Sequence, residues 1–243
     1  MTAPYFRWRV SPTYLAHLFK AVFKQHHKPL TPLFRRVIPD EGVVLDVGAH
    51  AGQYAKIFSR LASRGEVYAF EPGSYARSIL RIALWLNRRH NVAVLPIGLG
   101  AREGTEILTL PVKRHGSYGF GLAHFGAETR FQTVEREVVA VTTIDRVVEA
   151  LGLARLDFIK ADIEGWEMQL VRGGVTALRR FRPVMFLELN AQSLARAGDE
   201  VAPAFAAIAE LGYRPFMLTS TGELTPVTAP RNGDIWWFPD ERT

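Results

Sequence analysis

A short apolar run that ends in a glycine turn is the feature that most constrains the fold of this chain. Residues 43–47 read Val-Val-Leu-Asp-Val, and Gly48 and Gly52 follow within five positions. A short apolar run of this kind is typical of a strand buried on both faces, as in parallel sheets covered by helices. Because residues 53–62 then show helical spacing, the segment predicts the first strand–turn–helix unit of an α/β domain.

The same alternation of strands and helices continues along the chain. We expect further strands at residues 67–70, 92–95, 156–160, 184–189, 213–218 and 235–238. We expect helices at residues 53–62, 74–86, 144–151 and 166–178, and a last one that ends before Gly212; Ser74 and Asp199 are the expected caps of two of them. Residues 106–142 hold β-prone pieces around a glycine-rich loop. The pattern predicts an α/β fold with right-handed crossovers and helices on both faces of a mostly parallel sheet.

Composition excludes several classes of protein. The chain has 243 residues, of which 48% are hydrophobic and 22% charged, as in ordinary globular domains. Because it contains no cysteine, it has no disulfide, thiolate metal site or cysteine nucleophile. It shows neither the ~20 consecutive apolar residues of a membrane span nor a signal peptide, so we expect a cytoplasmic protein.

The net charge of +6 is concentrated near the N-terminus. Residues 1–39 contain seven basic side chains and no acidic one; since these exceed the net charge by one, residues 40–243 carry −1. We therefore expect a basic N-terminal arm (residues 1–39) and a nearly neutral domain (residues 40–243). A nucleic-acid-binding protein more often has a basic face on the folded domain, so no nucleic-acid partner is expected.

The arm contains one amphipathic helix. Residues 14–24 place apolar side chains on one side and Lys20 and Lys24 on the other. The apolar positions are Leu15, Leu18, Phe19, Val22 and Phe23. A lone helix cannot bury such a stripe, which leaves two interpretations. It packs on the domain or on the second subunit of a homodimer, closing one side of an acceptor pocket, or it binds peripherally to an anionic surface such as membrane lipid or a phosphorylated acceptor.

The turn after the first strand has the features of a nucleotide-cofactor site. Gly48 would let the backbone turn tightly against a ligand, and Gly52 would let the following helix pack closely on the strand. Glu71 ends the second strand, where a carboxylate can accept hydrogen bonds from both ribose hydroxyls. Asp46 stands where the NAD fingerprint has its first glycine, and its charge suits a cationic amino-acid ligand better than a pyrophosphate. The pattern favours S-adenosylmethionine over NAD; a tight turn without a ligand is the alternative.

A second acidic loop follows the strand at residues 156–160. Lys160 and Asp162 are two positions apart, so they point to one face at the carboxyl end of that strand. In a purely structural interpretation, Asp162 caps the next helix while Glu164 and Glu167 favour its positive N-terminus. In the functional interpretation, Asp162 lies at the ligand edge of the sheet and takes part in catalysis.

Together these motifs resemble the FkbM family of methyltransferases. The matching segments are residues 45–52 (LDVGAHAG), 70–72 (FEP) and 158–167 (FIKADIEGWE), with Gly98-Leu99-Gly100, Thr143-Ile144-Asp145 and Arg182-Pro183-Val184 leading to Glu188. The resemblance covers residues 43–218 and implies a Rossmann-like class I fold with a seven-stranded sheet. It also implies methylation of hydroxyls on sugars or natural-product scaffolds. Two departures are His50, where the family often has Asn, and Ala161, where a bulkier aliphatic residue is usual.

The resemblance also implies which residues hold S-adenosylmethionine. Asp46, Gly48 and Gly52 would hold the methionine moiety, Glu71 the ribose, and Gly98-Leu99 the adenine edge. The expected cofactor site further includes Ala49, His50, Tyr54 and Pro72. His50 is either a ligand-side residue or a polar group of the loop.

Methyl transfer to an aliphatic hydroxyl needs a base within hydrogen-bonding reach. The candidates are Asp162 and Glu188 at neighbouring strand ends, and His124 or His115 in the glycine-rich loop. We prefer Asp162 with Glu188, because strand ends position side chains more rigidly than loops, and place His124 next. The same carboxylates, with Asn190, could instead hold Mg²⁺ through oxygen ligands.

Residues 113–131 predict a lid on the acceptor side. Several glycines lie there among Tyr118, Phe120 and Phe125, whose rings could stack on a sugar or other ring. The alternative is an ordinary connection with turn glycines, but long loops in compact domains are more often functional.

Three other functions compete with this hypothesis. An NAD(P)-dependent oxidoreductase is disfavoured by Asp46 and by the lack of a Tyr-x-x-x-Lys pair. An RNA ribose methyltransferase would use Lys160 and Asp162, but the domain is nearly neutral. A non-catalytic scaffold would keep the fold only to bind a partner. The acceptor is expected to be a small molecule or glycan, with sugar, lipid-linked glycan, polyketide and peptide all left open.

Overall fold

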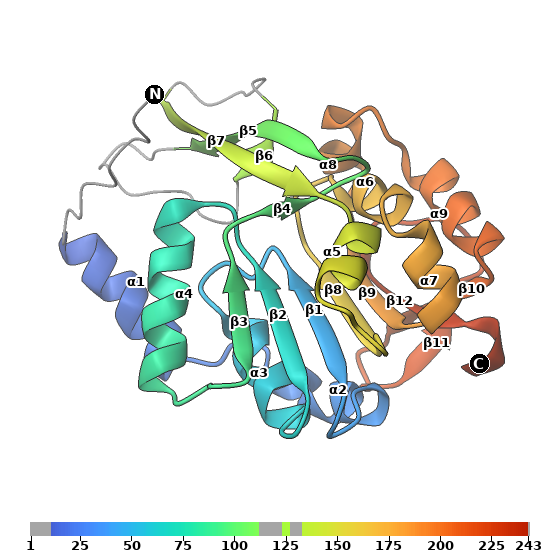
Figure 1. The fold of residues 1–243 in the computed structure, drawn as a ribbon. Helices are drawn as coiled ribbons and strands as arrows, with labels where there is room; N and C mark the ends of the chain where they lie inside the picture. Colours follow the sequence, from blue (N-terminus) through green and yellow to red (C-terminus); the bar gives the residue numbers. More distant parts are fainter. Residues whose placement is uncertain (1–10, 112–122, 127–132, 243) are drawn as a thin grey trace.

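A twisted, mostly parallel sheet forms the centre of the molecule (Figure 1). The computed structural model describes residues 11–111, 123–126 and 133–242. Within these residues the main sheet has eight strands in the order β11-β10-β12-β9-β8-β1-β2-β3. The strands are β1 (Val43–Val47), β2 (Glu66–Phe70), β3 (Val92–Leu95), β8 (Phe158–Ala161), β9 (Val184–Leu189), β10 (Tyr213–Leu218), β11 (Leu224–Pro226) and β12 (Gly233–Pro239). The predicted Rossmann-like α/β fold is confirmed, with the short β11 added to the seven expected strands.

The central strands are mainly apolar because both faces of the sheet are covered. In β1, Leu45 contributes to the core on one face and Val44 to the core on the other. The neighbouring β8 repeats this arrangement with Ile159 and Phe158. Strands β2, β1, β8 and β9 run parallel, so their carboxyl ends meet at one edge of the sheet. The antiparallel β12 and β10 complete the other side.

Helices cover both faces of the sheet. The helices are α2 (Thr31–Val37), α3 (Gln53–Leu61), α4 (Ser74–Leu86), α5 (Ile144–Ala150), α6 (Glu167–Arg172), α7 (Val175–Phe181), α8 (Ala191–Arg196) and α9 (Val201–Glu210). Phe34 of α2 and Phe58 of α3 are fully buried on the same face as Phe158. Leu170, Leu178 and Ile208 of α6, α7 and α9 are buried on the opposite face. The core therefore reaches into the segment before residue 40.

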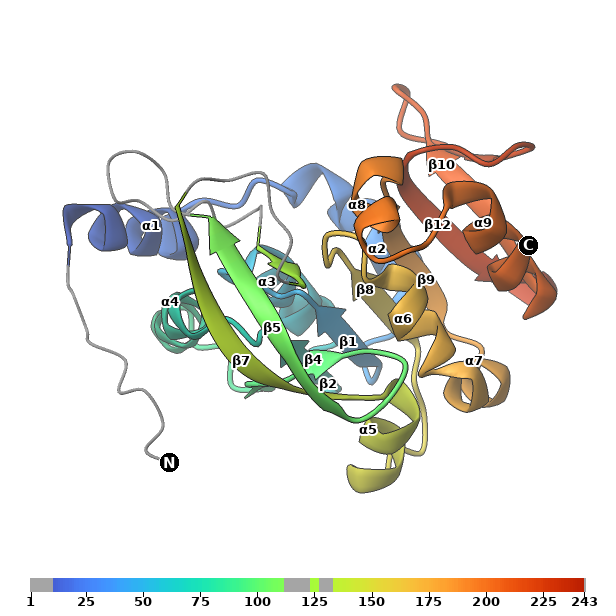
Figure 2. The ribbon, with the colours of Figure 1, turned by 90° about the horizontal axis from the view of Figure 1, so that it is seen from above.

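A smaller sheet lies over the carboxyl edge of the main sheet. It consists, within the described residues, of β4 (Gly98–Leu99), β5 (Gly104–Pro111), β6 (His124–Phe125) and β7 (Val134–Thr142), in the order β4-β7-β5-β6. Figure 2, a view from above, shows β5 and β7 crossing over β1 and β2. The sequence predicted only β-prone pieces here, because the pairing of β5 with β7 joins segments about 30 residues apart.

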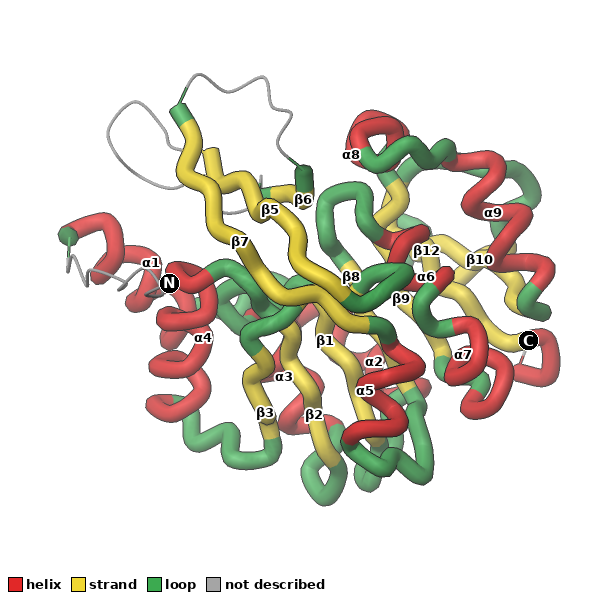
Figure 3. The backbone as a smooth tube through the Cα atoms, turned by 45° about the horizontal axis from the view of Figure 1, so that its top comes forward, coloured by secondary structure: helices red, strands yellow, loops and turns green. Residues whose placement is uncertain are grey.

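Several predicted helix ends were wrong. The helix expected at residues 166–178 is divided into α6 and α7 at Gly173 and Gly174, which have low helix propensity (Figure 3). Ser74 is the first residue of α4 rather than its cap, and its hydroxyl donates to Glu137 at 2.7 Å. Asp199 accepts a hydrogen bond from Arg172 at 3.1 Å instead of capping α9. The short α8 was not predicted.

The N-terminal helix α1 (Pro12–Phe23) packs against α4. Its buried side is formed by Tyr14 and Ala21, with Leu18 and Val22 partly buried. The Tyr14 hydroxyl lies 3.1 Å from that of Ser78, and this turns that side toward α4. Packing on the domain is thus confirmed, but the single predicted stripe was wrong: its members divide between the contact with α4 and the exposed side. Within the described residues, none of the helices is long and apolar enough to span a bilayer.

Candidate functional site

A cavity of about 210 Å³ opens at the carboxyl ends of β1, β2 and β8, beneath the smaller sheet. The predicted cofactor residues on its wall are Gly48, Ala49, His50, Tyr54, Glu71 and Pro72. Asp162, Glu164 and His124 lie on the wall as well, with apolar side chains from β5 and β6. The structure therefore brings the two sequence motifs to one cavity, as parallel strand ends require.

The turn after β1 depends on two glycines. Gly48 has a φ of +70°, and a side chain there would overlap the main-chain carbonyl of Asp162, so it allows the two motif loops to touch. Gly52 has a φ of +83°, and a Cβ on it would lie 2.6 Å from Leu80 of α4. Gly52 therefore serves the approach of α3 to α4, which corrects the expected helix–strand contact. It does not lie on the cavity wall.

Glu71 is held in place by two backbone donors. The N–H of His50 donates to one carboxylate oxygen and the N–H of Gly73 to the other, both at 2.8 Å. Burial raises the pKa of Glu71 to about 7, although these two donors act in the opposite direction. Each oxygen has a second lone pair for a ligand hydroxyl, so the predicted ribose contact fits the geometry. Burial, with help from the Lys160 ammonium, lowers the pKa of His50 to about 4, so its imidazole is neutral.

Asp46 lies beneath the wall rather than on it. Its carboxylate is fully buried, and the Lys160 ammonium lies 3.8 Å from it. Burial raises the pKa of Asp46 to about 6 against the effect of Lys160. This corrects the expectation that Asp46 faces a cationic ligand, because Lys160 is its partner. Lys160 also donates to the Gly48 carbonyl at 3.1 Å, which links the two motifs.

Gly98 and Leu99 lie behind the cavity in β4. Leu99 is buried in the main core, and a Cβ on Gly98 would lie 2.7 Å from the ring of Phe125. Phe125 is on the wall, whereas Gly98 and Leu99 are not. A contact of these two residues with adenine stays a prediction.

Asp162 and Glu188 form a hydrogen-bonded pair of carboxyl groups. Burial alone raises the pKa of Asp162, but the Lys160 ammonium, 3.8 Å away, and a hydrogen bond with Glu188 outweigh it and lower this pKa below its ordinary value. Burial and the neighbouring Asp162 raise the pKa of Glu188 to about 8. Near neutral pH, Glu188 is therefore protonated and donates to an ionised Asp162. Asp162 faces the cavity, while Glu188 supports it from β9.

A further carboxyl group was missed by the sequence reasoning. Asp234 of β12 pairs in register with Glu188 of β9, and burial followed by the charge of Asp162 raises its pKa. It also contributes, after burial, to the raised pKa of Tyr54. Asp234 lies in no motif, and only the antiparallel pairing of β12 brings it here.

The expected magnesium site does not fit the residues. Asn190 accepts from the backbone N–H groups of Gln192 and Ser193, at 3.0 and 3.2 Å, as the cap of α8. Its oxygen is thus used within the fold. Within the described parts of the chain, no group of three or more histidine or acidic side chains is arranged to hold a metal ion. We derive no step through a metal.

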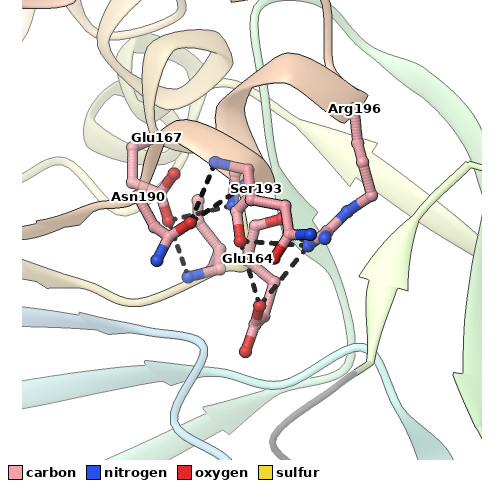
Figure 4. Close-up of polar contacts among 8 residues, drawn as sticks. Glu164, Glu167, Asn190, Ser193 and Arg196 are labelled. Carbon is pink, nitrogen blue, oxygen red and sulfur yellow. Dashed lines mark hydrogen bonds and ion pairs between the residues drawn. The ribbon is translucent and has the colours of Figure 1, made fainter. Parts of the chain in front are cut away.

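The acidic residues after Asp162 have separate roles (Figure 4). Glu167 begins α6 and accepts from the N–H groups of Ile163 and Gly165, at 3.0 and 3.4 Å, which confirms its structural interpretation. Asp162 is not a cap, because Trp166 occupies that position. Glu164 has a φ of +55°, lines the cavity and pairs with the guanidinium of Arg196 at 3.4 Å.

His124 is buried in β6 and lies on the wall, where a base or acceptor-binding residue could act. Phe125 also lies on the wall, with its ring 5.0 Å from that of Trp166. The predicted lid is described only at residues 123–126. His115, Tyr118 and Phe120 lie outside the described residues.

His27 reaches the wall from the N-terminal segment. Its ring stacks on that of Tyr54 at 4.2 Å, and burial, followed by the Lys160 charge, lowers its pKa. The segment after α1 thus closes one side of the cavity, as one interpretation of the arm expected. No local signal marked His27, because its partner lies in another helix.

Similarity to known proteins shows which family this chain belongs to. A family model described as the methyltransferase FkbM domain matches residues 46–215. This chain belongs to the FkbM methyltransferase family. The match begins at the end of β1 and contains both motif loops and β8, and it confirms the resemblance inferred from the sequence.

Two fungal relatives of this FkbM-family chain are also methyltransferases by name. Methyltransferase sdnD of Sordaria araneosa is 25% identical over 179 residues, covering 64% of this chain and 67% of that protein. Methyltransferase 1 of Beauveria bassiana is 24% identical over 147 residues, covering 56% of this chain and 59% of that protein. The chain thus spans about two thirds or less of these relatives.

Solved structures show the same fold. The FkbM methyltransferase of Methylobacillus flagellatus has a TM-score of 0.51 and 16% identity, covering 93% of this chain and 58% of that one. A putative O-methyltransferase from Klebsiella pneumoniae has a TM-score of 0.52 and 13% identity, covering 95% and 90%. At these identities the likeness is one of fold, and the FkbM-family chain has the Rossmann-like methyltransferase architecture.

Proposed function

We propose that this chain is an S-adenosylmethionine-dependent O-methyltransferase that acts on a hydroxyl of a sugar, glycan or natural-product scaffold. The observation that carries the proposal is the position of Asp162. Its side chain lines the cavity, the Lys160 ammonium lies 3.8 Å from its carboxylate, and Glu188 of β9 is its hydrogen-bond partner. A carboxylate fixed in this way can accept the proton that a hydroxyl loses.

The wall of the cavity suits S-adenosylmethionine. Glu71 would accept from the ribose hydroxyls, while the turn at Gly48–His50 and the ring of Tyr54 would enclose the amino-acid part. The apolar Leu108 and Leu110 offer surface for a base. When bound, the cofactor supplies a methyl group already activated by its sulfonium, so the protein mainly aligns the acceptor and excludes water.

The acceptor side favours an alcohol. Asp162 would accept the hydroxyl proton when the bound cofactor supplies its methyl group to the oxygen, and Glu188 would hold the Asp162 carboxylate in place before transfer. His124 and Glu164 can hydrogen-bond neighbouring hydroxyls, and Phe125 can pack on the apolar face of a sugar ring.

Two measurements test the proposal. Calorimetry with S-adenosylmethionine, S-adenosylhomocysteine and NAD should show binding of the first two only, and binding of NAD alone would falsify the cofactor assignment. Incubation of the protein with methyl-labelled cofactor and a cell extract, followed by mass spectrometry, should place the label on an oxygen atom. Label on nitrogen or carbon would exclude O-methylation while leaving the cofactor assignment intact.

A further inference from the structure

The outer side of α1 carries a row of exposed apolar side chains. Leu15, Phe19 and Phe23 are four residues apart, so they lie on one side of the helix. They are 53%, 57% and 72% exposed, and the rings of Phe19 and Phe23 lie 4.8 Å apart. The opposite side of α1 already packs on α4 through Tyr14 and Ala21. The row is therefore not required for holding α1 on the domain.

The end of α4 extends this apolar surface. Asn87, which follows α4, donates to the carbonyl of Val22 at 3.3 Å, so the carboxyl ends of the two helices meet. Trp85 and Leu86 at this end are 73% and 50% exposed. We call the surface formed by Leu15, Phe19, Phe23, Trp85 and Leu86 the α1–α4 face. Such a grouping of large exposed apolar residues marks an interaction surface.

Both helices that form this face, with the turns that follow them, are purely basic. Residues 11–27 and 72–91 contain no Asp or Glu. The basic residues are Lys20 and Lys24 in the first segment and Arg77, Arg81, Arg88 and Arg89 in the second. Since residues 40–243 as a whole carry −1, this concentration of positive charge is local.

We propose that the α1–α4 face docks on an anionic lipid surface. The exposed aromatic and leucine side chains would enter the boundary between headgroups and acyl chains, and Lys20 and Lys24 would meet the headgroups. Each basic residue near an anionic leaflet adds attraction, and neither α1 nor α4 contains an acidic residue that would oppose it. A second copy of the chain fits less well, because a two-fold contact through this face would oppose two positively charged surfaces.

Docking would place the cofactor turn near the lipid. His17, Lys20 and Ala21 of α1 line a small cavity of about 160 Å³ together with His50 and Ala51 of that turn. His27, four residues after the end of α1, lies on the wall of the main cavity. The proposed surface and the cavity are thus connected through one short segment of chain.

Co-sedimentation of the full-length protein with lipid vesicles tests the proposal. Binding to vesicles that contain phosphatidylglycerol should be strong at low salt and weaker at physiological ionic strength, and phosphatidylcholine alone should bind little. Replacing Phe19 and Phe23 with Ser, or Lys20 and Lys24 with Gln, should weaken binding on the order of tenfold or more. The matched control is Val138→Ser, on β7, which is 76% exposed but lies outside the α1–α4 face. Thermal melting should show that all variants remain folded.

A second readout uses Trp85 as a reporter of insertion. Brominated phosphatidylglycerol should quench the tryptophan fluorescence of the wild type, and Trp85→Phe should reduce the quenched fraction. The proposal is overturned if the wild type ignores phosphatidylglycerol at low salt, or if Phe19→Ser with Phe23→Ser binds as the wild type does. It is equally overturned if the protein is a dimer in solution that these two substitutions convert to a monomer, since the face would then join two copies.

Discussion

The buried ammonium of Lys160 influences the pKa values of the carboxyl groups around it. Lys160 lies 3.8 Å from both Asp46 and Asp162, and Glu188 is the hydrogen-bond partner of Asp162. One cation cannot support three carboxylates in a poorly solvated place, and burial and the charges of Asp162 and Asp234 raise the pKa of Glu188, so this group keeps its proton. The lowered pKa of Asp162 and the raised pKa of Glu188 are two results of that one constraint.

Removing the charge of Asp162 should separate catalysis from folding. Asp162→Asn keeps the shape of the side chain but cannot accept the acceptor's proton, so turnover should fall by about a hundredfold or more. Steady-state methyl transfer measures this, with S-adenosylmethionine affinity and melting temperature as controls. If turnover stays near the wild-type value, the base lies elsewhere, and His124→Asn becomes the variant that should fail.

The protonation of Glu188 should be visible in the pH dependence of stability. Its pKa is about 8 in the folded protein against an ordinary 4.5, so the folded state holds a proton that the unfolded state releases. The stability from this group is full below pH 4.5 and is lost as the pH rises through 8.

Accordingly, the wild-type melting temperature should fall between pH 5 and pH 9 more steeply than that of Glu188→Gln, which cannot ionise. The lowered pKa of Asp162 acts below this interval and should not interfere. Parallel curves for the two proteins would show that Glu188 is ionised in the folded state.

At the scale of elements, the contact between the β1 and β8 loops is the central joint of the site. It exists because Gly48 leaves room for the carbonyl of Asp162 and because Lys160 donates to the carbonyl of Gly48. Each loop thereby fixes the other, and both line the cavity. A substitution at this joint should therefore lower both the free energy of unfolding and the affinity for the ligand.

Gly48→Ala should therefore lower the free energy of unfolding by about 1–3 kcal/mol, the usual range for strain at a left-handed residue, because its methyl group also meets the Asp162 carbonyl. Urea unfolding measures the change, and calorimetry should show weaker S-adenosylmethionine binding. Gly104→Ala is the matched control, since no atom lies within 4 Å of the added methyl group. Equal effects of the two substitutions would contradict the role given to the joint.

The sequence predicted the elements whose signals are local. Strands such as Val43–Val47 and Val184–Leu189 were placed correctly, because burial on both faces of the sheet requires mainly apolar segments. The cofactor turn and Asp162 were found for a related reason, since parallel strands place their loops at one edge. Other features depend on partners far along the chain: the smaller sheet, Asp234 beside Glu188, His27 on Tyr54, and the pairing of Asp46 with Lys160. No single segment contains that information.

At the scale of the whole molecule, the N-terminal segment is joined to the domain by several polar contacts. The buried Lys56 ammonium of α3 donates to the carbonyls of Ala21 and Lys24, which end α1. Gln25 donates to the carbonyl of Gln53 at 2.6 Å. The N-terminal segment therefore differs from the domain in charge but packs against it, and residues of α2 belong to the hydrophobic core.

Replacing two phenylalanines of this segment with alanine should change the free energy of unfolding by very different amounts. Phe34→Ala should cost about 3–5 kcal/mol of unfolding free energy, because Phe34 is fully buried among Phe58, Phe158 and Trp236. Phe23→Ala should leave stability nearly unchanged, because that side chain is largely exposed. Chemical denaturation of both variants provides the comparison. A large loss of stability for Phe23→Ala would mean that the face is covered in the free protein.

The strand order of the main sheet also determines when its last strands can join the sheet during synthesis of the chain. β10 and β11 leave the ribosome before β12, yet β12 lies between β10 and β9. The β10–β11 hairpin therefore has no place beside the finished part of the sheet until residues 233–239 arrive and insert. Closure of this half must wait until residues 233–239 have been synthesised, and a chaperone that shields exposed strand edges would act during that interval.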